Sequence, residues 1–238
     1  IYSNDSVQLF NVSVNNNSGR AIFGSSGSFL NAENVTISGN QDNEEYPGYT
    51  GISNYGYMSF KHATIANNFS TSNNAIEILS GSTLNFINSI LAGNGTGTCS
   101  NYGGTINRYG HNIEDTNTCG FIVPDDMVNT DPELGPLTDN GGPTLTHAIL
   151  PGSRAINEAD DAYCPNTDQR GVERTVGSHC DIGAFETRAT STLEDALKYL
   201  MITTRTHPPE MPSLDGDVND DKRLGLPEAM YTLKDLAE

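Results

Sequence analysis

The sequence predicts an all-β fold, a right-handed parallel β-helix, followed by a small α-helical module, and three observations carry this prediction. A short β-branched strand that ends at a turn recurs along residues 1–98. Apolar residues make up 35% of the chain, with 24 glycines and no tryptophan, a composition that suits a narrow solenoid with polar turns. In residues 189–238 the apolar residues change to helical spacing.

The repeats close on Asn17, Asn40, Asn68 and Asn94, in steps of 23, 28 and 26 residues. A period of this size indicates stacked units that are each too small to bury their own apolar face. Stacking would place the four asparagines in a ladder at a turn, where asparagine tolerates the left-handed conformation and its amide can bond the next coil. The usual crossover preference makes the winding right-handed.

Apolar side chains alternate at matched positions in each repeat, as a strand with one inward face requires. A second apolar group, at residues 21–23, 51–52 and 75–78, supplies another sheet. The positions that we expect to stack are Val7, Leu30, Met58 and Leu84; Leu9, Ala32, Phe60 and Phe86; Val12, Val35, Ala63 and Ser89; and Val14, Ile37, Ile65 and Leu91.

The net charge of −18 argues against electrostatic binding to nucleic acid or to anionic membranes, and favours solubility and binding of divalent cations. No apolar run approaches the length of about 18 residues that a membrane span needs. The chain begins within repeat-like sequence, so we expect a targeting segment and further repeats to precede Ile1.

The four cysteines lack the Cys-x-x-Cys spacing of zinc or redox sites. An even number in separated loops favours two disulfides in an oxidising compartment, and hence an extracellular or cell-surface protein. Of the three possible pairings we favour Cys99–Cys119 and Cys164–Cys180, because each closes a short local loop.

The longest repeat step contains a polar insertion at residues 41–49. Insertions on one face of a solenoid are often its binding surface, so this loop is a candidate for gripping a sugar or a cation, with a merely solvated loop as the alternative. Its candidate residues are Asp42, Glu44, Glu45, Tyr46 and Tyr49. We interpret the Asn-x-Ser/Thr motifs at Asn11, Asn34 and Asn68 as products of the repeat rather than as glycan acceptors.

Residues 99–188 lose the regular period, and we expect them to form irregular, disulfide-containing C-terminal coils after the regular coils of residues 1–98. Their blocks are Thr130-Asp131-Pro132-Glu133, Asp139-Asn140-Gly141-Gly142-Pro143, Thr146-His147-Ala148-Ile149, Asp168-Gln169-Arg170-Gly171 and Cys180-Asp181-Ile182-Gly183-Ala184-Phe185-Glu186. In this order they resemble the C-terminal part of β-helix proteins of the choice-of-anchor Q type, over roughly residues 100–187. The resemblance implies a right-handed parallel β-helix and an exported bacterial protein, and it implies no reaction and no catalytic residue.

Two features of these blocks invite a chemical interpretation. Asp168 and Arg170 are close enough in sequence to pair and to hold a loop. His147 is a candidate metal ligand, but no second His or Cys at ligand spacing accompanies it, so a structural role is the stronger interpretation.

Residues 189–238 begin with a capping box, Ser191-Thr192-Leu193-Glu194, which starts a helical period. After a proline-rich linker, residues 217–228 carry oxygen side chains at positions 1, 3, 5 and 12, which is the spacing that wraps hard ligands around Ca²⁺. Lys222 stands where such loops normally have glycine, which predicts a weakened affinity. The expected ligands are Asp217, Asn219, Asp221, Glu228 and the backbone carbonyl of Arg223.

Residues 193–200 align with residues 226–233 at an offset of 33, so the module contains two loop–helix units. Two such units resemble a dockerin-type domain, which implies calcium binding and docking to a cohesin-like partner or to the end of the β-helix. The first unit would need ligands at Ala184, Glu186 and Arg188, so we expect it to be metal-free.

Two functions follow. We expect a secreted or cell-surface structural and binding protein, a rigid rod with a calcium-dependent docking module that assembles into filaments or adheres to glycans. The alternative is a polysaccharide lyase or glycoside hydrolase acting on an acidic polysaccharide, which rests on fold analogy. Its nearest candidate set is Asp42, Glu44 or Glu45 with Lys61 and His62. The absence of a recognisable catalytic motif favours the first function.

Overall fold

The computed structural model describes residues 1–42, 51–69, 75–174 and 177–187. Within them all regular structure is β, apart from one short 3₁₀ helix, η1 (Asp161–Tyr163). None of their helices is long and apolar enough to cross a membrane. The chain divides into two compact units, Ile1–Glu186 and Thr187–Glu238. The expected helical module of residues 189–238, with its calcium loop, lies outside the described residues.

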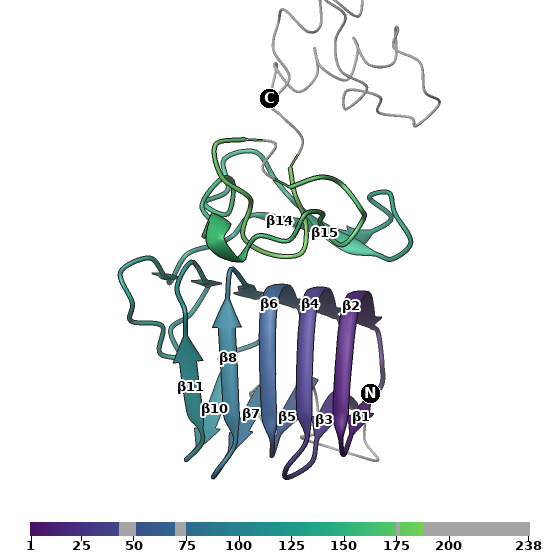
Figure 1. Cartoon of the computed structure of the whole chain (residues 1–238), viewed down its shortest axis with the longest axis vertical. Coiled ribbons are helices and arrows are strands. Elements are labelled where there is room, and N and C mark those ends of the chain that lie inside the picture. Colours follow the sequence, from purple (N-terminus) through teal and green to yellow (C-terminus); the bar gives the residue numbers. More distant parts are fainter. Residues whose placement is uncertain (43–50, 70–74, 175–176, 188–238) are drawn as a thin grey trace, which may run out of the picture. The chain divides into compact units, whose positions relative to one another are not determined.

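The first unit is built on a parallel β-solenoid, as the sequence predicts (Figure 1). Every strand pair in its two sheets is parallel and joins successive coils. The five-stranded sheet contains β1 (Tyr2–Ser3), β3 (Arg20–Gly24), β5 (Gly51–Asn54), β7 (Ile76–Leu79) and β10 (Cys99–Tyr102). The eight-stranded sheet contains β2 (Ser6–Asn15), β4 (Phe29–Ser38), β6 (Tyr57–Ala66), β8 (Thr83–Ile87), β9 (Ile90–Ala92), β11 (Thr105–Arg108), β12 (Ile113–Glu114) and β13 (Met127–Val128).

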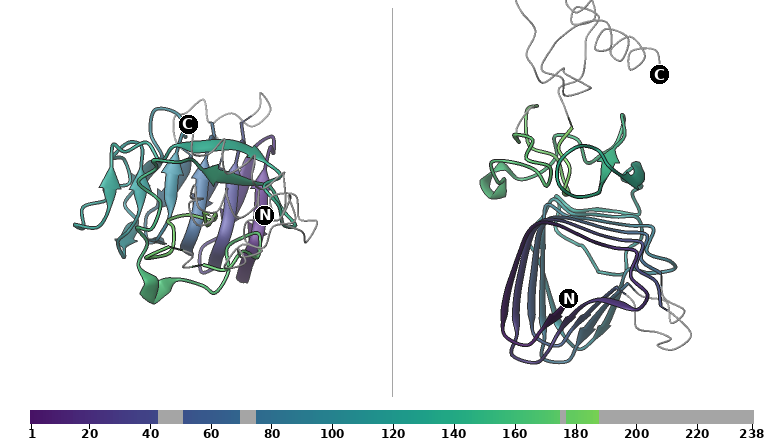
Figure 2. Two further views of the ribbon diagram at one scale, coloured as in Figure 1. Left: turned by 90° about the horizontal axis from the view of Figure 1, so that it is seen from above. Right: turned by 90° about the vertical axis from the view of Figure 1, so that its right-hand side faces the viewer.

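A left-handed residue bends each coil in the middle of its long strand. The positions are Asn11, Asn34, His62, Asn88 and His111, with φ between 48° and 55°. Asparagine and histidine are among the few side chains that tolerate this conformation. The bend gives each coil three sides, which Figure 2 shows in its right-hand view. We call the outward surface before the bend the flat face and the outward surface after it the covered face.

The predicted register of the coils is confirmed. Leu30 of β4 pairs with Val7 of β2 and Met58 of β6, and the rows that start at Leu9 and Val14 stack in the same way. The inward side chains form one continuous apolar core in which Phe60 and Phe86 stack at 5.7 Å between ring centroids. Because each coil places apolar side chains at the same positions of these rows, the core continues along the axis from one coil to the next.

The predicted asparagine ladder is also present. The Nδ2 atoms of Asn17, Asn40 and Asn68 donate to the Oδ1 of the next asparagine at 2.7, 2.8 and 3.1 Å, and each Oδ1 also accepts from the backbone N–H of the coil before it. The left-handed conformation belongs to the residue before each ladder asparagine, so that part of the expectation is wrong. These residues are Asn16, Gly39, Asn67 and Gly93. The ladder asparagines therefore serve as hydrogen-bonding groups and not as backbone hinges.

The solenoid continues through β13, and the chain then folds back over the covered face (Figure 1). We call residues 132–186 the lateral cap. Its two strands, β14 (Leu134–Thr138) and β15 (Thr146–Ile149), pair antiparallel and belong to neither sheet of the solenoid. Of the residues expected to form irregular coils, those up to Val128 do so and the cap residues do not. The turn-rich sequence around Gly141 and Gly142 lacks the apolar alternation that a coil needs.

The lateral cap is fixed to the coils by a second apolar cluster, which packs Ile90, Ala92 and Ile113 of the coils against Ile149, Ala155 and Ile182 of the cap, and by polar contacts. Thr36 Oγ1 donates to Gln169 Oε1 at 2.7 Å, and Ala184 N donates to Thr64 Oγ1 at 3.0 Å. Outward threonines and serines, which would face water on a bare solenoid, are therefore buried here.

Both favoured disulfides are present, one in each part of the unit. Cys99–Cys119 ties β10 to the loop after β12, and Cys164–Cys180 lies within the lateral cap. Neither thiol pair is free in this structure.

Candidate functional site

A groove of about 450 Å³ lies where the coils turn after β6, β9 and β12 and the chain enters the lateral cap. Its lining contains both polar and apolar side chains. The lining residues are Ala66, Asn67, Ala92, Gly93, Asp115, Asn129, Asp131, Pro132 and Leu134. Three of them, Asn67, Gly93 and Asn129, have positive φ, so the backbone turns sharply along the groove.

Asp115 is the most perturbed group in this groove. Its Oδ2 accepts a hydrogen bond from Gly93 N at 2.6 Å, while its Oδ1 is buried and has no partner among the described residues. Burial raises the pKa of this carboxyl, and the nearby charges of Glu114 and Asp131 raise it further. Asp131 is exposed, and its Oδ1 accepts from Glu133 N at 2.8 Å.

The neighbouring carboxylate of Glu114 has a purely structural role, and its hydrogen bonds contrast with those of Asp115. It is fully buried, and its Oε1 accepts hydrogen bonds from Thr116, Thr118 and the backbone N–H of Cys119. These bonds hold the loop that carries the Cys99–Cys119 disulfide. Glu114 is saturated with donors, whereas one oxygen of Asp115 is not, so the groove carboxylate is the one with unused hydrogen-bonding capacity.

Two carboxyl groups that face one groove, one of them with a raised pKa, are the elements of general acid–base chemistry on a sugar. Among the described residues that line the groove there is no Lys, Arg or His.

The structure does not bring Lys61 and His62 together as a catalytic pair. Lys61 lies on the flat face and forms an ion pair with Glu33 of the neighbouring coil. His62 sits at the bend, fully buried beneath the lateral cap. The left-handed conformation of His62 bends the strand at this point, so Lys61 lies on the flat face and His62 lies under the lateral cap.

His62 is held in one tautomer by its neighbours. The amide of Asn88 is oriented by Asp160, whose N–H donates to Oδ1 and whose carbonyl accepts from Nδ2. Asn88 Nδ2 therefore also donates to His62 Nε2 at 2.9 Å, and the ring proton resides on Nδ1. Burial lowers the pKa of His62 well below its usual range, and the positive charges of Arg174 and Lys61 lower it further.

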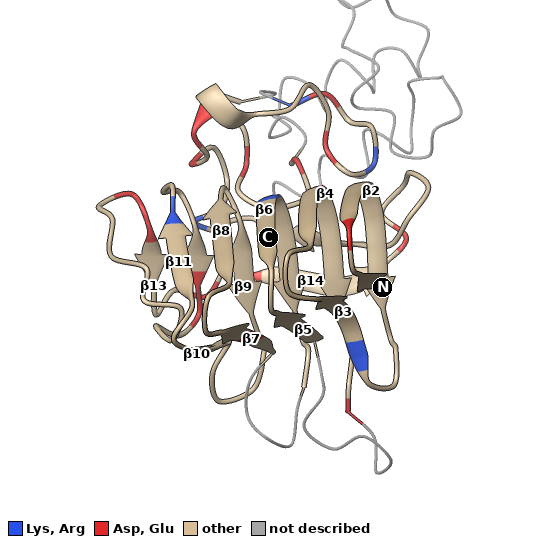
Figure 3. Ribbon diagram, turned by 60° about the horizontal axis from the view of Figure 1, so that its bottom comes forward, with Lys and Arg blue, Asp and Glu red and all other residues tan. Residues whose placement is uncertain are grey.

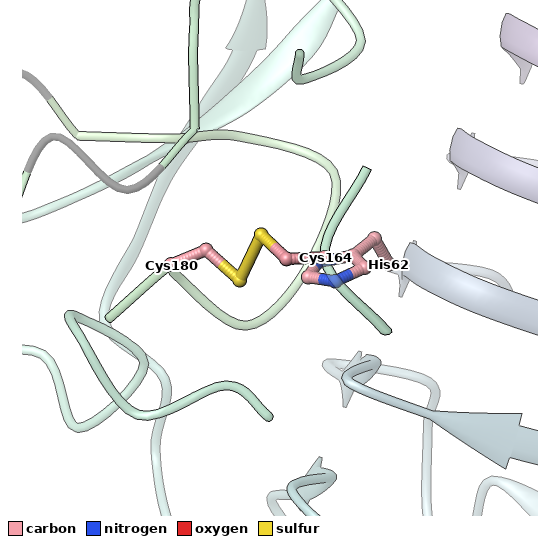
Figure 4. Close-up of side chains that lie close together, drawn as sticks. All are labelled: His62, Cys164 and Cys180. Carbon is pink, nitrogen blue, oxygen red and sulfur yellow. A yellow bond between two sulfur atoms is a disulfide. The ribbon is translucent and has the colours of Figure 1, made fainter. Parts of the chain in front are cut away.

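His62 also packs against the Cys164–Cys180 disulfide (Figure 4). One potential ligand atom from each of the three residues lies within 4.8 Å of the others, and within the described ranges this is the only such group of three or more. The two sulfur atoms are bonded to each other and are not thiolates, which are the form that binds metals. In this oxidised state the group is a packing contact beneath the lateral cap and not a metal centre.

Several predicted residues have definite positions. Asp168 and Arg170 pair as expected, with Arg170 Nε at 2.9 Å from Asp168 Oδ2. His147 is buried, its Nε2 lies 2.8 Å from Ser38 Oγ and its Nδ1 lies 2.7 Å from Gly135 O. These contacts agree with the structural interpretation of this histidine.

Other predicted residues are only partly covered. In the insertion, Asp42 is described and donates its N–H to Phe69 O, whereas Glu44, Glu45, Tyr46 and Tyr49 lie outside the described residues. The amides of Asn34 and Asn68 are buried and hydrogen-bonded, which leaves Asn11 as the exposed member of the three motifs.

No family model, no curated protein and no solved structure matches the chain. The groove was missed by sequence reasoning because Asp115 and Asp131 come from different turns. The one sequence feature that points to the groove is the position of Asp115, directly after the buried strand that ends at Glu114. Nothing in the sequence shows that Asp131 lies across from it.

Proposed function

We propose that the protein is an exported structural and binding protein of the extracellular space or cell surface. In this proposal a stiff right-handed β-solenoid carries a dockerin-like, calcium-dependent docking module at residues 189–238. The observation that carries the proposal is the continuous solenoid, with its asparagine ladder and two disulfides. Disulfides support an oxidising compartment.

The expected partner follows from the resemblance of residues 189–238 to a dockerin-type domain. A dockerin-like module is expected to bind a cohesin-like protein or the end of a solenoid, and the resemblance of the cap blocks to choice-of-anchor Q proteins agrees with export. End-to-end association into filaments is a second route to assembly, because solenoid ends expose strand edges. Electron microscopy of the purified protein tests filament formation directly.

Calcium binding tests the docking module. Titration of the calcium-free protein with Ca²⁺ is expected to show one site, and EGTA is expected to lower the melting temperature of the module. Asp217→Ala should abolish the site because it removes the first ligand of the loop. Asp215→Ala is the matched control, since this aspartate lies outside the proposed ligand register. A melting temperature and a calorimetric trace that are both indifferent to Ca²⁺ would remove the assignment.

The groove supports a second candidate, a glycoside hydrolase. Asp115, with its raised pKa, would act as the acid, and Asp131 would act as the second carboxylate. A screen of neutral and acidic polysaccharides for new reducing ends tests this activity. Turnover that disappears in Asp115→Asn and persists in Asp125→Asn, an exposed aspartate outside the groove, would establish the hydrolase and overturn a purely structural role.

A further inference from the structure

The flat face of the first three coils presents an ordered row of unpaired hydrogen-bonding side chains. Gln8, Asn31 and Ser59 occupy matched positions on β2, β4 and β6, so they stand one strand spacing apart, about 4.8 Å. Gln8 and Asn31 are exposed and Ser59 is half-buried. None of the three side chains forms a hydrogen bond with another described residue, in contrast to Asn107 and Asn85 further along the same row, which bond each other at 2.8 Å.

Aromatic rings border this row on both sides. Phe29 and Tyr57 lie next to it on one side, with ring centroids 5.6 Å apart and planes tilted by 37°. Phe10 lies on the other side. Phe10 and Phe29 are both 55% exposed. We call this row together with its flanking side chains on β2, β4 and β6 the strip. Its rings offer apolar contact, and its polar side chains can both donate and accept hydrogen bonds.

The strip is electrically neutral in a strongly acidic protein. Its two charged side chains, Glu33 and Lys61, neutralise each other in an ion pair. Figure 3 shows that the strands are largely free of charged residues and that the acidic ones gather in the loops. The whole chain carries −18, so an anionic polymer would be repelled from the molecule at long range.

These observations together select the chemistry of a partner. A peptide that adds a strand needs a free backbone edge, which a flat sheet face does not offer. A sugar ring has C–H faces that pack on aromatic rings and hydroxyl groups that both donate and accept, as the carboxamides and the serine hydroxyl do. We propose that the flat face of β2, β4 and β6 binds an uncharged polysaccharide, which lies across the strands along the row Gln8–Asn31–Ser59. This inference deepens the proposed binding function and names its ligand class.

Affinity electrophoresis of the full chain through gels that contain a polysaccharide tests the proposal, with isothermal calorimetry for the affinities. The probes are hydroxyethyl cellulose and galactomannan as neutral polymers, and alginate and polygalacturonate as anionic ones. EGTA is present throughout, so that the calcium module plays no part. Retardation by at least one neutral polymer is expected, with no retardation by the anionic ones.

Three variants locate the site. Phe29→Ala and Tyr57→Ala are each expected to weaken binding about 2- to 10-fold, the fold-change that corresponds to the energy of one aromatic pair. Asn31→Ala tests the row itself, and because Asn31 is exposed it keeps the test valid if an aromatic variant fails to fold. Tyr2→Ala is the matched control, because Tyr2 stacks on Phe23 at 4.8 Å in the other sheet, and it should leave the affinity unchanged.

Three outcomes would overturn the proposal: no retardation by either neutral polymer, retardation that all three variants leave intact, or a sedimenting dimer that the same variants dissociate, which would make a second copy the occupant. Failure of calcium binding would refute the docking module and leave this site standing. Failure here would leave the calcium module standing.

Discussion

The coils and the lateral cap differ in the kind of side chain that they bury. Among the described residues of the first 98, no Asp, Glu, Lys or Arg is buried, and the core is a stack of repeated apolar rows. The lateral cap instead buries Asp168, Arg174, Asp181 and Glu186. It covers a face that carries the hydroxyl groups of Thr36, Ser38 and Thr64 beside the apolar Ile90 and Ala92, so both polar and apolar contacts attach it.

Arg174 is the centre of the cap's attachment. Its guanidinium pairs with Glu186 at 3.1 Å and donates to Asn34 Oδ1 of the coils at 2.8 Å and to the carbonyls of Asp181 and Gly183. In the coils, equivalent contacts recur in every repeat, so each of them is one among many. The lateral cap is attached by contacts that occur only once. The comparison therefore predicts that single substitutions do most harm in the cap.

Arg174→Ala should have the largest effect. It leaves Glu186 and several acceptors buried without their partner, and losing one side of a buried ion pair costs about 3–5 kcal/mol. We expect the cap to loosen while the coils persist, so that limited proteolysis cuts the cap first and urea unfolding becomes biphasic. Arg154→Ala, at an exposed position in the same segment, should be nearly neutral. A single sharp transition with unchanged stability would contradict the comparison.

Asn68→Ala is the strongest test within the coils. Asn68 is buried and bonds Asn40, Asn94 and two backbone carbonyls, so its loss leaves several buried groups unpaired at about 1–3 kcal/mol each. We expect a loss of roughly 3 kcal/mol in chemical denaturation. Asn17→Ala, at the exposed end of the same ladder, should cost under about 1 kcal/mol. Equal effects at the two positions would show that the ladder is not cooperative along its length.

The interface between cap and coils should weaken in acid. The pKa values of His62 and His147 are both lowered, mainly by burial, so the unfolded chain takes up protons that the folded chain does not. Stability is therefore complete above pH of about 6.5 and falls as the pH drops below it. For His62 the charges of Arg174 and Lys61 act in the same direction.

The coils themselves supply the variant that tests this pH effect. His62→Asn places at this bend the residue that Asn34 and Asn88 provide in neighbouring coils, so the backbone conformation is retained. It should flatten the loss of stability between pH 6.5 and 5, measured by thermal melting, relative to the unmodified chain. His179→Asn, an exposed histidine paired with Asp161, should leave the profile steeper than His62→Asn does. Identical profiles for all three proteins would exclude His62 as a source of the effect.

Asp115→Asn should have the smallest effect, and of opposite sign. Because burial raises the pKa of Asp115, its ionised form is disfavoured in the folded groove at neutral pH. The neutral amide should raise the melting temperature slightly at pH 7, and the gain should vanish as the pH falls below about 3.8. Asp125→Asn should produce no such pH-dependent gain. A lower melting temperature at pH 7 would show that the bond from Gly93 outweighs the cost of burial.

Sequence reasoning predicted the coils well because their determinants are local and repeated. The inward rows and the asparagine ladder follow from the repeat spacing, since a period that recurs fixes which residues meet. The two disulfides were favoured because each closes a short local loop. The path of the lateral cap did not follow, because Arg174 and Asn34 are 140 residues apart and Arg174 lies outside the repeats. The groove was missed for the same reason, since Asp115 and Asp131 have no shared spacing.

The sequence by itself determined that this protein is a parallel β-solenoid, because alternation and period dictate stacking before any long-range contact forms. Only the tertiary structure decided what each solenoid face does. Thr36 and Ser38 would be solvent-exposed by their pattern, yet the returning chain buries them, while Asn31 and Phe29 on the same strand stay exposed. A strand pattern distinguishes inward from outward side chains, and it cannot tell water from a second segment of protein on the outward side.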